Sequence, residues 1–172
     1  MKNLKAVLLA LLILSLNLSC KKDSMPPKPT QTGANTMYAK VNGKPWQKKA
    51  CWSCISGGGA LDAVYEDGTL KFFVTGQNND QKIVISVGVK ELKSIGTYPL
   101  SNKDLNFGYI TTENFRYFTS NNSLGIIKIT KIDLANKIIS GTFEFTAEDE
   151  NNSANTIKVT DGWFDIVYET YI

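Results

Sequence analysis

The residues best placed for chemistry in this sequence are two cysteines separated by two residues, in the segment Cys51-Trp52-Ser53-Cys54. Such a pair forms the redox centre of thiol–disulfide oxidoreductases when the first thiol lies at a helix N-terminus, where the helix dipole stabilises the thiolate. Three consecutive glycines follow at positions 57–59, and glycine disfavours a helix. We therefore predict a structural disulfide between Cys51 and Cys54, with a free or strained pair and a redox centre as the alternatives.

Metal and cofactor sites are not expected. The sequence contains no histidine, which excludes Ser-His-Asp and Cys-His catalytic systems and zinc sites that need imidazole ligands. Cys51 and Cys54 alone supply too few ligands for structural zinc. Residues 149–160 resemble a calcium loop but lack its central glycine and closing glutamate, so a hairpin loop is predicted there. Glycines 57–59 lack the spacing and the Lys-Ser/Thr of phosphate loops.

Pairs of carboxylates are the catalytic chemistry that the composition still permits, as in glycoside hydrolases. The candidates are Glu144, Asp161, Asp165 and Glu169, which lie in or beside predicted strands. Glu144 and Glu169 alternate with apolar residues, so they are predicted to face solvent. We predict no catalytic residues and a non-enzymatic protein, and a hydrolase is the alternative.

Aromatic residues offer a different chemistry, because the apolar faces of Trp and Tyr rings stack on sugar rings. Trp46, Trp52 and Trp163 lie near predicted turns and are the candidates for ligand stacking. A second group crowds one region of the sequence: Tyr109, Phe115, Tyr117 and Phe118. Most aromatic residues of a small β domain fill its core, and this is the competing interpretation.

The first twenty residues indicate export. Lys2 and Lys5 precede an apolar run at 6–14, which is too short to span a hydrocarbon layer of about 30 Å. The run ends at Leu18-Ser19-Cys20, where a small residue precedes cysteine; this resembles the lipobox of bacterial lipoproteins, with a departure at Asn17. The resemblance implies a signal peptide over 1–19 and acyl chains, such as palmitate, on Cys20. An ordinary cleaved signal is the alternative.

The mature chain then starts with a tether over residues 20–35, which contains three of the five prolines and little apolar surface. Its Asp23-Ser24-Met25 resembles the O-glycosylation motif of Bacteroidota, which makes Ser24 a candidate acceptor. Cleavage removes Lys2 and Lys5, so the formal net charge falls from +3 to +1 and no nucleic-acid partner is expected. The resemblance implies a bacterial outer membrane lipoprotein, facing the periplasm or exposed at the surface, in an oxidising compartment that favours disulfides.

Residues 36–172 are predicted to form a single all-β domain, an antiparallel β-sandwich or β-barrel of about 8–10 strands. Short β-branched and aromatic runs alternate with polar residues and are separated by turn residues. Asn42-Gly43 predicts a two-residue hairpin turn, and Asp161-Gly162 predicts a bulge or a tight turn. The aromatic-rich run 107–119 is predicted as one strand, and 121–123 and 149–155 as hairpin connections.

Several segments resemble an uncharacterised family of Bacteroidota β-rich lipoproteins: Val41–Trp46, Gly96–Leu100, Ile129–Asp133, Ile139–Phe145 and Thr160–Asp165. This resemblance implies a fold and a location and carries no activity. The expected function is a lipid-anchored envelope protein with a non-enzymatic binding or structural β domain. Its partners would be the membrane and, as alternatives, a surface glycan or a small hydrophobic ligand that a barrel would enclose.

Overall fold

The computed structural model describes residues 29–50, 61–66, 71–101, 106–122 and 124–169. Within these residues the chain forms eleven β-strands and no helix, and every pairing between named strands is antiparallel. The strands are β1 (Thr36–Val41), β2 (Lys44–Gln47), β3 (Leu61–Glu66), β4 (Lys71–Asn78), β5 (Ile83–Val89), β6 (Gly96–Leu100), β7 (Phe107–Thr111), β8 (Arg116–Phe118), β9 (Gly125–Asp133), β10 (Ile138–Asp149) and β11 (Thr156–Val167).

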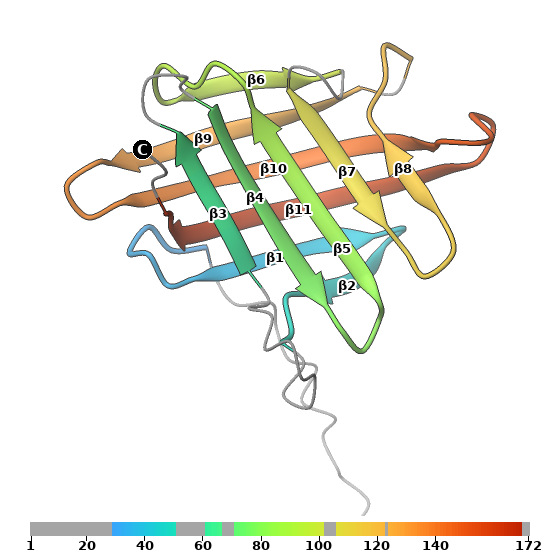
Figure 1. Cartoon of the computed structure of the whole chain (residues 1–172), viewed down its shortest axis with the longest axis horizontal. Helices are drawn as coiled ribbons and strands as arrows, with labels where there is room; N and C mark the ends of the chain where they lie inside the picture. The colour runs from blue at the N-terminus through green and yellow to red at the C-terminus, as the bar shows by residue number, and fades with distance from the viewer. Residues whose placement is uncertain (1–28, 51–60, 67–70, 102–105, 123, 170–172) are drawn as a thin grey trace, which may run out of the picture.

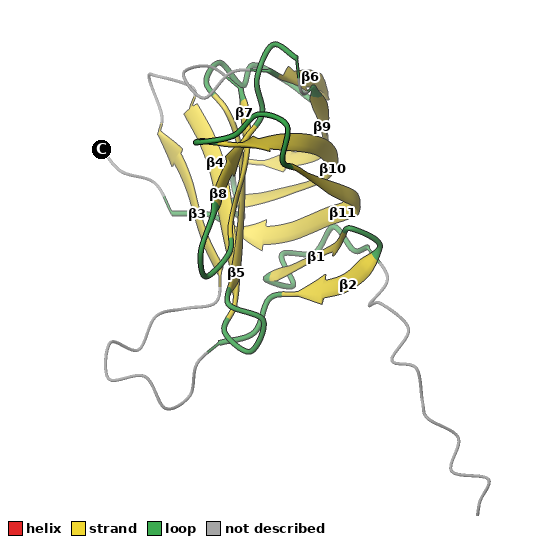
Figure 2. Ribbon diagram, turned by 90° about the vertical axis from the view of Figure 1, so that its right-hand side faces the viewer, coloured by secondary structure: helices red, strands yellow, loops and turns green. Residues whose placement is uncertain are grey.

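The strands belong to one curled sheet that folds into two facing layers. The back layer has the order β2-β1-β11-β10-β9-β6, and the front layer has the order β8-β7-β5-β4-β3. The layers join at β10, where residues 138–145 pair with β9 while Glu148 and Asp149 pair with β8. Figure 2 shows the layers edge-on, and in Figure 1 the front strands run steeply across the back strands. The prediction of an all-β antiparallel fold is confirmed, in the form of a half-barrel.

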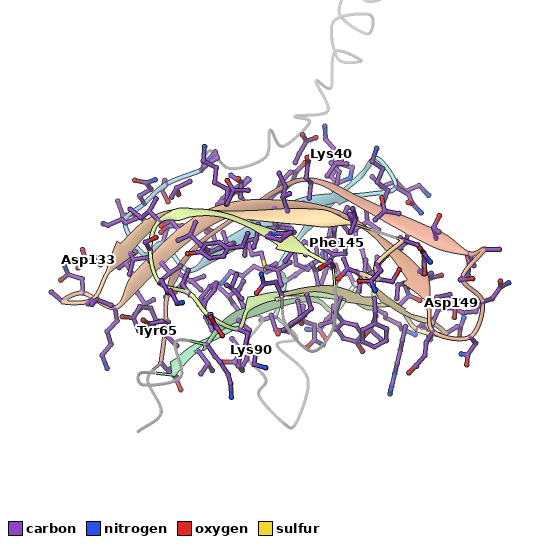
Figure 3. All side chains as sticks on the ribbon, turned by 90° about the horizontal axis from the view of Figure 1, so that it is seen from above. Lys40, Tyr65, Lys90, Asp133, Phe145 and Asp149 are labelled. Atoms are coloured by element: carbon purple, nitrogen blue, oxygen red, sulfur yellow. The ribbon has the colours of Figure 1, made fainter. Side chains whose placement is uncertain are left out.

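Alternation along the strands decides which side chains fill the space between the layers. In β10, Phe143 and Phe145 are buried, whereas Glu144 is exposed as predicted. Phe145 points from β10 into the interior in Figure 3. Burial of such a side chain contributes about 1.5–3 kcal/mol to stability. The largest side chains with under 2% exposure come from strands of both layers and, for Leu92, from the connection between β5 and β6: Trp46, Phe72, Phe164, Met37, Ile85, Leu92, Leu100, Ile110, Ile127, Ile129, Ile139 and Ile166.

Two local features follow the sequence prediction. Asn42 and Gly43 both have positive φ, at 48° and 77°, and form the two-residue turn between β1 and β2. Asn and Gly tolerate this left-handed conformation, which the tight hairpin requires. Asp161 has φ of 51° at a register shift between β10 and β11, so the predicted bulge is confirmed.

Two connections differ from the prediction. The single strand predicted over 107–119 is wrong, because a turn separates β7 from β8: the Thr112 N–H donates to the Phe115 carbonyl at 2.9 Å, and the Phe115 N–H donates to the Thr112 hydroxyl at 3.2 Å. The hairpin predicted at 121–123 is also wrong. A hairpin would pair β8 with β9, but β8 pairs with β7 and β10, whereas β9 pairs with β10 and β6. This connection therefore leads from the front layer to the back layer.

Candidate functional site

The candidate site lies on the outward side of the front layer, the side that Figure 1 presents to the viewer. Strands β4, β5 and β7 alternate, so that Phe72, Ile85 and Ile110 point into the core and their neighbours point outward. Because adjacent strands are in register, outward residues of the same row lie side by side across the sheet. Two rows of this kind bring together partly exposed aromatic rings.

The first row consists of Phe73 on β4, Gly88 on β5 and Phe107 on β7, which are direct partners in register. A Cβ atom added at Gly88 would lie 2.5 Å from Cε1 of Phe107 and 3.1 Å from Cβ of Phe73. The Phe107 ring therefore occupies the space above Gly88, beside Phe73. Glycine is required at this position, because any side chain would displace the ring.

The second row is polar at one end and aromatic at the other. Thr75 pairs with Ser86, and their hydroxyl oxygens are 2.7 Å apart. Ser86 pairs with Tyr109, and Tyr109 pairs with Phe118, whose ring centroid is 4.6 Å from that of Tyr109. We call the surface formed by Phe73, Phe107, Tyr109 and Phe118 the aromatic face.

A hollow adjoins the aromatic face, because Phe118 also lines it. It has a volume of about 560 Å³ and opens to solvent at the junction of β8 and β10. We call it the polar hollow. Its lining residues are Ser101, Phe118, Thr119, Ser120, Asn121, Glu148, Asp149, Glu150, Asn151, Asn152 and Ser153.

Hydrogen bonds hold two carboxylates of the polar hollow in place. The Asp149 side chain accepts from the Asn151 N–H at 2.9 Å and from the Asn155 side-chain amide at 3.0 Å. The Ser120 hydroxyl donates to Glu148 at 3.0 Å. The lining contains carboxylates, amides and hydroxyls but no Lys or Arg among the described residues, which suits a ligand that donates hydrogen bonds.

The carboxyl with the largest resolved shift of pKa lies away from this site, on the outward side of the back layer. Asp165 is fully buried, and burial, the largest influence, raises its pKa. Hydrogen bonds from the Thr30 hydroxyl, the Ala34 and Gly33 N–H groups and the Ser140 hydroxyl outweigh burial and lower the pKa to about 2. Asp165 therefore joins the end of the predicted tether to the domain.

Of the other carboxylates considered for catalysis, two border one hollow and the third lies apart from them. Glu144 and Asp161 border a hollow on the outward side of the back layer, and Asp161 forms a 2.8 Å ion pair with Lys40. Glu169 is exposed, as predicted, and forms an isolated bridge with Val64. No group of three or more Cys, Asp or Glu side chains that would suit a metal ion occurs among the described residues.

Two of the three tryptophans considered for ligand stacking are described, and both are buried. Trp46 is 1% exposed in the core, and its Nε1–H donates to the Ile83 carbonyl at 3.3 Å. Trp163 is 6% exposed and stacks on Tyr38 with 6.4 Å between ring centroids. Stacking of a ligand on either ring would require neighbouring residues to move.

The remaining predicted site residues lie outside the described residues: Cys20, Ser24, Cys51, Trp52 and Cys54. Their predicted lipidation, glycosylation, disulfide and stacking stay predictions. The described part of the chain holds no apolar helix of membrane-spanning length.

The aromatic face was only partly accessible to sequence reasoning. The crowding of Tyr109 and Phe118 pointed to the region, but Phe73 and Phe107 join them only through the register of β4, β5 and β7. The available signal was the placing of Phe107 and Tyr109 at alternate positions of one strand, together with a glycine at position 88.

Comparison with known proteins gives a family. No curated protein and no solved structure matches the chain. The sequence pattern of one family, described as a domain of unknown function (DUF6252), matches residues 36–167. The match runs from the first residue of β1 to the last residue of β11, so it spans both layers and well over half of the sequence. The chain therefore belongs to the DUF6252 family.

Proposed function

We propose that this protein is a lipid-anchored protein of the bacterial outer membrane whose β domain binds a glycan on the aromatic face, without catalysis. The observation that carries the proposal is the pair of register-matched rows that place Phe73, Phe107, Tyr109 and Phe118 on one outward sheet surface. The lipid anchor rests on the lipobox at Leu18-Ser19-Cys20.

The chemistry of the aromatic face fits a sugar chain. The axial C–H groups of a pyranose form an apolar face that stacks on an aromatic ring, while its hydroxyls seek hydrogen-bond acceptors and donors. The aromatic rings of the aromatic face supply the surface on which the sugar ring stacks. Glu148, Asp149 and the side-chain amides of the polar hollow supply the hydrogen-bond partners for its hydroxyls. Because the rings stand on paired strands, their positions are fixed before a ligand arrives, which lowers the entropic cost of binding.

A carrier of a small hydrophobic ligand has less support. Such a carrier needs an apolar cavity between its layers. Here Phe72, Phe164 and Ile85 are among the side chains that fill this space, each less than 2% exposed. The polar hollow opens to solvent and is lined mainly by polar side chains.

A glycan array tests the proposed function. The probe is the mature chain with Cys20→Ala, which keeps residues 20–172 and removes the acylation site. We expect binding to a subset of immobilised oligosaccharides, and binding about tenfold weaker for Phe107→Ala, which corresponds to about 1.4 kcal/mol.

Phe115→Ala is the matched control, because Phe115 is a 47% exposed aromatic residue on the turn between β7 and β8, outside both rows. It should bind as the parent does. Absence of binding by the parent chain on the array would count against the aromatic face as a glycan site. An equal loss of affinity in Phe107→Ala and Phe115→Ala would also count against it.

A further inference from the structure

The outward side of the back layer is a second surface with unusual composition. It lies on the opposite side of the domain from the aromatic face (Figures 2 and 3). Leu124 and Ile126 are 60% and 43% exposed, although they are large and apolar. They line a hollow of about 350 Å³, and Ile126 also lines a second hollow of about 430 Å³. We call this surface, centred on Leu124 and Ile126, the anchor-side face.

The chain enters the domain on this face. Pro29 lines the hollow of about 430 Å³ together with Ile126. Thr30 donates a hydrogen bond to Asp165, and the Lys131 ammonium donates to the Gln31 carbonyl at 2.8 Å. The first described residues are thus bound to the outward side of the back layer before β1 begins.

The position of the predicted lipid site limits how far this face is from the membrane. Cys20 precedes Pro29 by nine residues. At about 3.3–3.6 Å per residue, a fully extended segment of this length spans only about 30 Å. An acylated Cys20 would therefore keep Pro29, and the anchor-side face that Pro29 lines, within that distance of the bilayer.

The charges around the two exposed apolar residues suit a phospholipid surface. Lys128 on β9 and Lys158 on β11 are exposed on either side of them, and Glu144 lies between. Asp161 on the same side is neutralised by its ion pair with Lys40. Lysines beside exposed aliphatic side chains are typical of surfaces that lie in a headgroup region, where each contributes to attraction by anionic lipid.

We propose that the anchor-side face rests on the phospholipid surface, with Leu124 and Ile126 at the interface and Lys128 and Lys158 against lipid phosphates. This inference rests on the lipid anchor of the proposed function. It assigns the aromatic face to the side that points away from the membrane, where a glycan has access. Acylation then fixes an orientation as well as a location.

Photo-crosslinking on vesicles tests this orientation. The acylated mature chain, residues 20–172, is reconstituted in vesicles of phosphatidylethanolamine and phosphatidylglycerol that contain a photoactivatable phospholipid. The adducts are mapped by peptide mass spectrometry. We expect adducts in β9 and in the residues just before it. The double variant Leu124→Glu with Ile126→Glu should still float with the vesicles but lose most of these adducts.

Thr111→Glu is the control for an added negative charge, because it places one of the two glutamates on the outward side of β7 instead. Its adduct pattern should equal that of the parent. Flotation with adducts on β4, β5 or β7, or an unchanged pattern in the double variant, would overturn the proposed orientation alone. Failure of the parent to float would overturn the lipid anchor and this orientation, and it would leave glycan binding on the array unaffected.

Discussion

The hydroxyl of Ser140 donates a 2.8 Å hydrogen bond to the carboxylate of Asp165, which has no exposed surface. The same carboxylate accepts from the Thr30 hydroxyl and from the backbone N–H groups of residues 32–34, at 2.9–3.1 Å for the N–H groups. An ionised carboxylate is costly to bury unless it is fully hydrogen-bonded, and here the segment before β1 provides most of the donors. This contact joins the predicted tether to the last strand.

Asp165→Asn should destabilise the domain by about 2–4 kcal/mol, because the amide turns a donor toward N–H groups that need an acceptor. Urea denaturation of the mature Cys20→Ala chain measures the change. Asp161→Asn is the control, since it removes only an exposed ion pair with Lys40 and should cost no more than about 1 kcal/mol. Equal effects of the two variants would show that the buried contacts of Asp165 contribute little.

The stability that Asp165 provides should depend on pH. Its pKa in the folded chain, about 2, is below the ordinary value of 3.8, so the ionised form favours the folded state. This contribution, about 2 kcal/mol, is present above pH 3.8 and is lost as the pH falls toward 2. The stability difference between the parent and Asp165→Asn should therefore shrink as urea titrations move from about pH 6 to about pH 2. A constant difference would contradict the assignment of this titration to Asp165.

Gly88→Ala should weaken glycan binding without removing an aromatic ring. Its methyl group would lie 2.5 and 2.7 Å from two ring atoms of Phe107, so the ring must leave its place above β5. We expect a loss of affinity similar to that of Phe107→Ala, about tenfold, by titration with the oligosaccharide found on the array. Ser86→Ala on the same strand and face is the control. An unchanged affinity in Gly88→Ala would show that the position of the Phe107 ring does not contribute to glycan binding.

Cys20→Ala should abolish acylation and move the protein from the membrane fraction to the soluble fraction, because the apolar run at 6–14 is too short to anchor it. Fractionation with detection of incorporated palmitate provides the measurement. Ser24→Ala is the control, since it alters the candidate glycosylation site and leaves the lipobox intact. Undiminished membrane retention of Cys20→Ala would refute the lipoprotein prediction.

Cys51 and Cys54 should be joined by a disulfide in the exported protein, because the proposed acylation of Cys20 would leave them as the two free thiols and the proposed envelope compartment would be oxidising. Intact mass should be lower by two hydrogens than that of the reduced chain, and alkylation should require a reductant. Closing so short a loop contributes only about 2 kcal/mol, so the Cys51→Ser and Cys54→Ser double variant should still fold. Two thiols that react without reductant would exclude the bridge.

The features that the sequence alone determined are those that depend on near neighbours. Strand alternation with a period of two established the all-β class and the exposure of Glu144 and Glu169. Asn42-Gly43 and Asp161-Gly162 identified a turn and a bulge, because their backbone preferences act within a few residues. The predicted export signal and the candidate lipid site, which stay predictions, likewise rest on continuous stretches of sequence.

Tertiary structure decided what depends on register between distant strands. Phe73 and Phe107 come together only because each pairs with Gly88, and no local pattern encodes those pairings. In the sequence, Asp165 is simply one polar position in an alternating strand. Its hydrogen-bond donors in the segment before β1, however, are more than 130 residues away in the sequence. Alternation assigns a side chain to a face of its strand. Long-range pairing, which optimises the burial of the whole core at once, decides which side chains meet on that face.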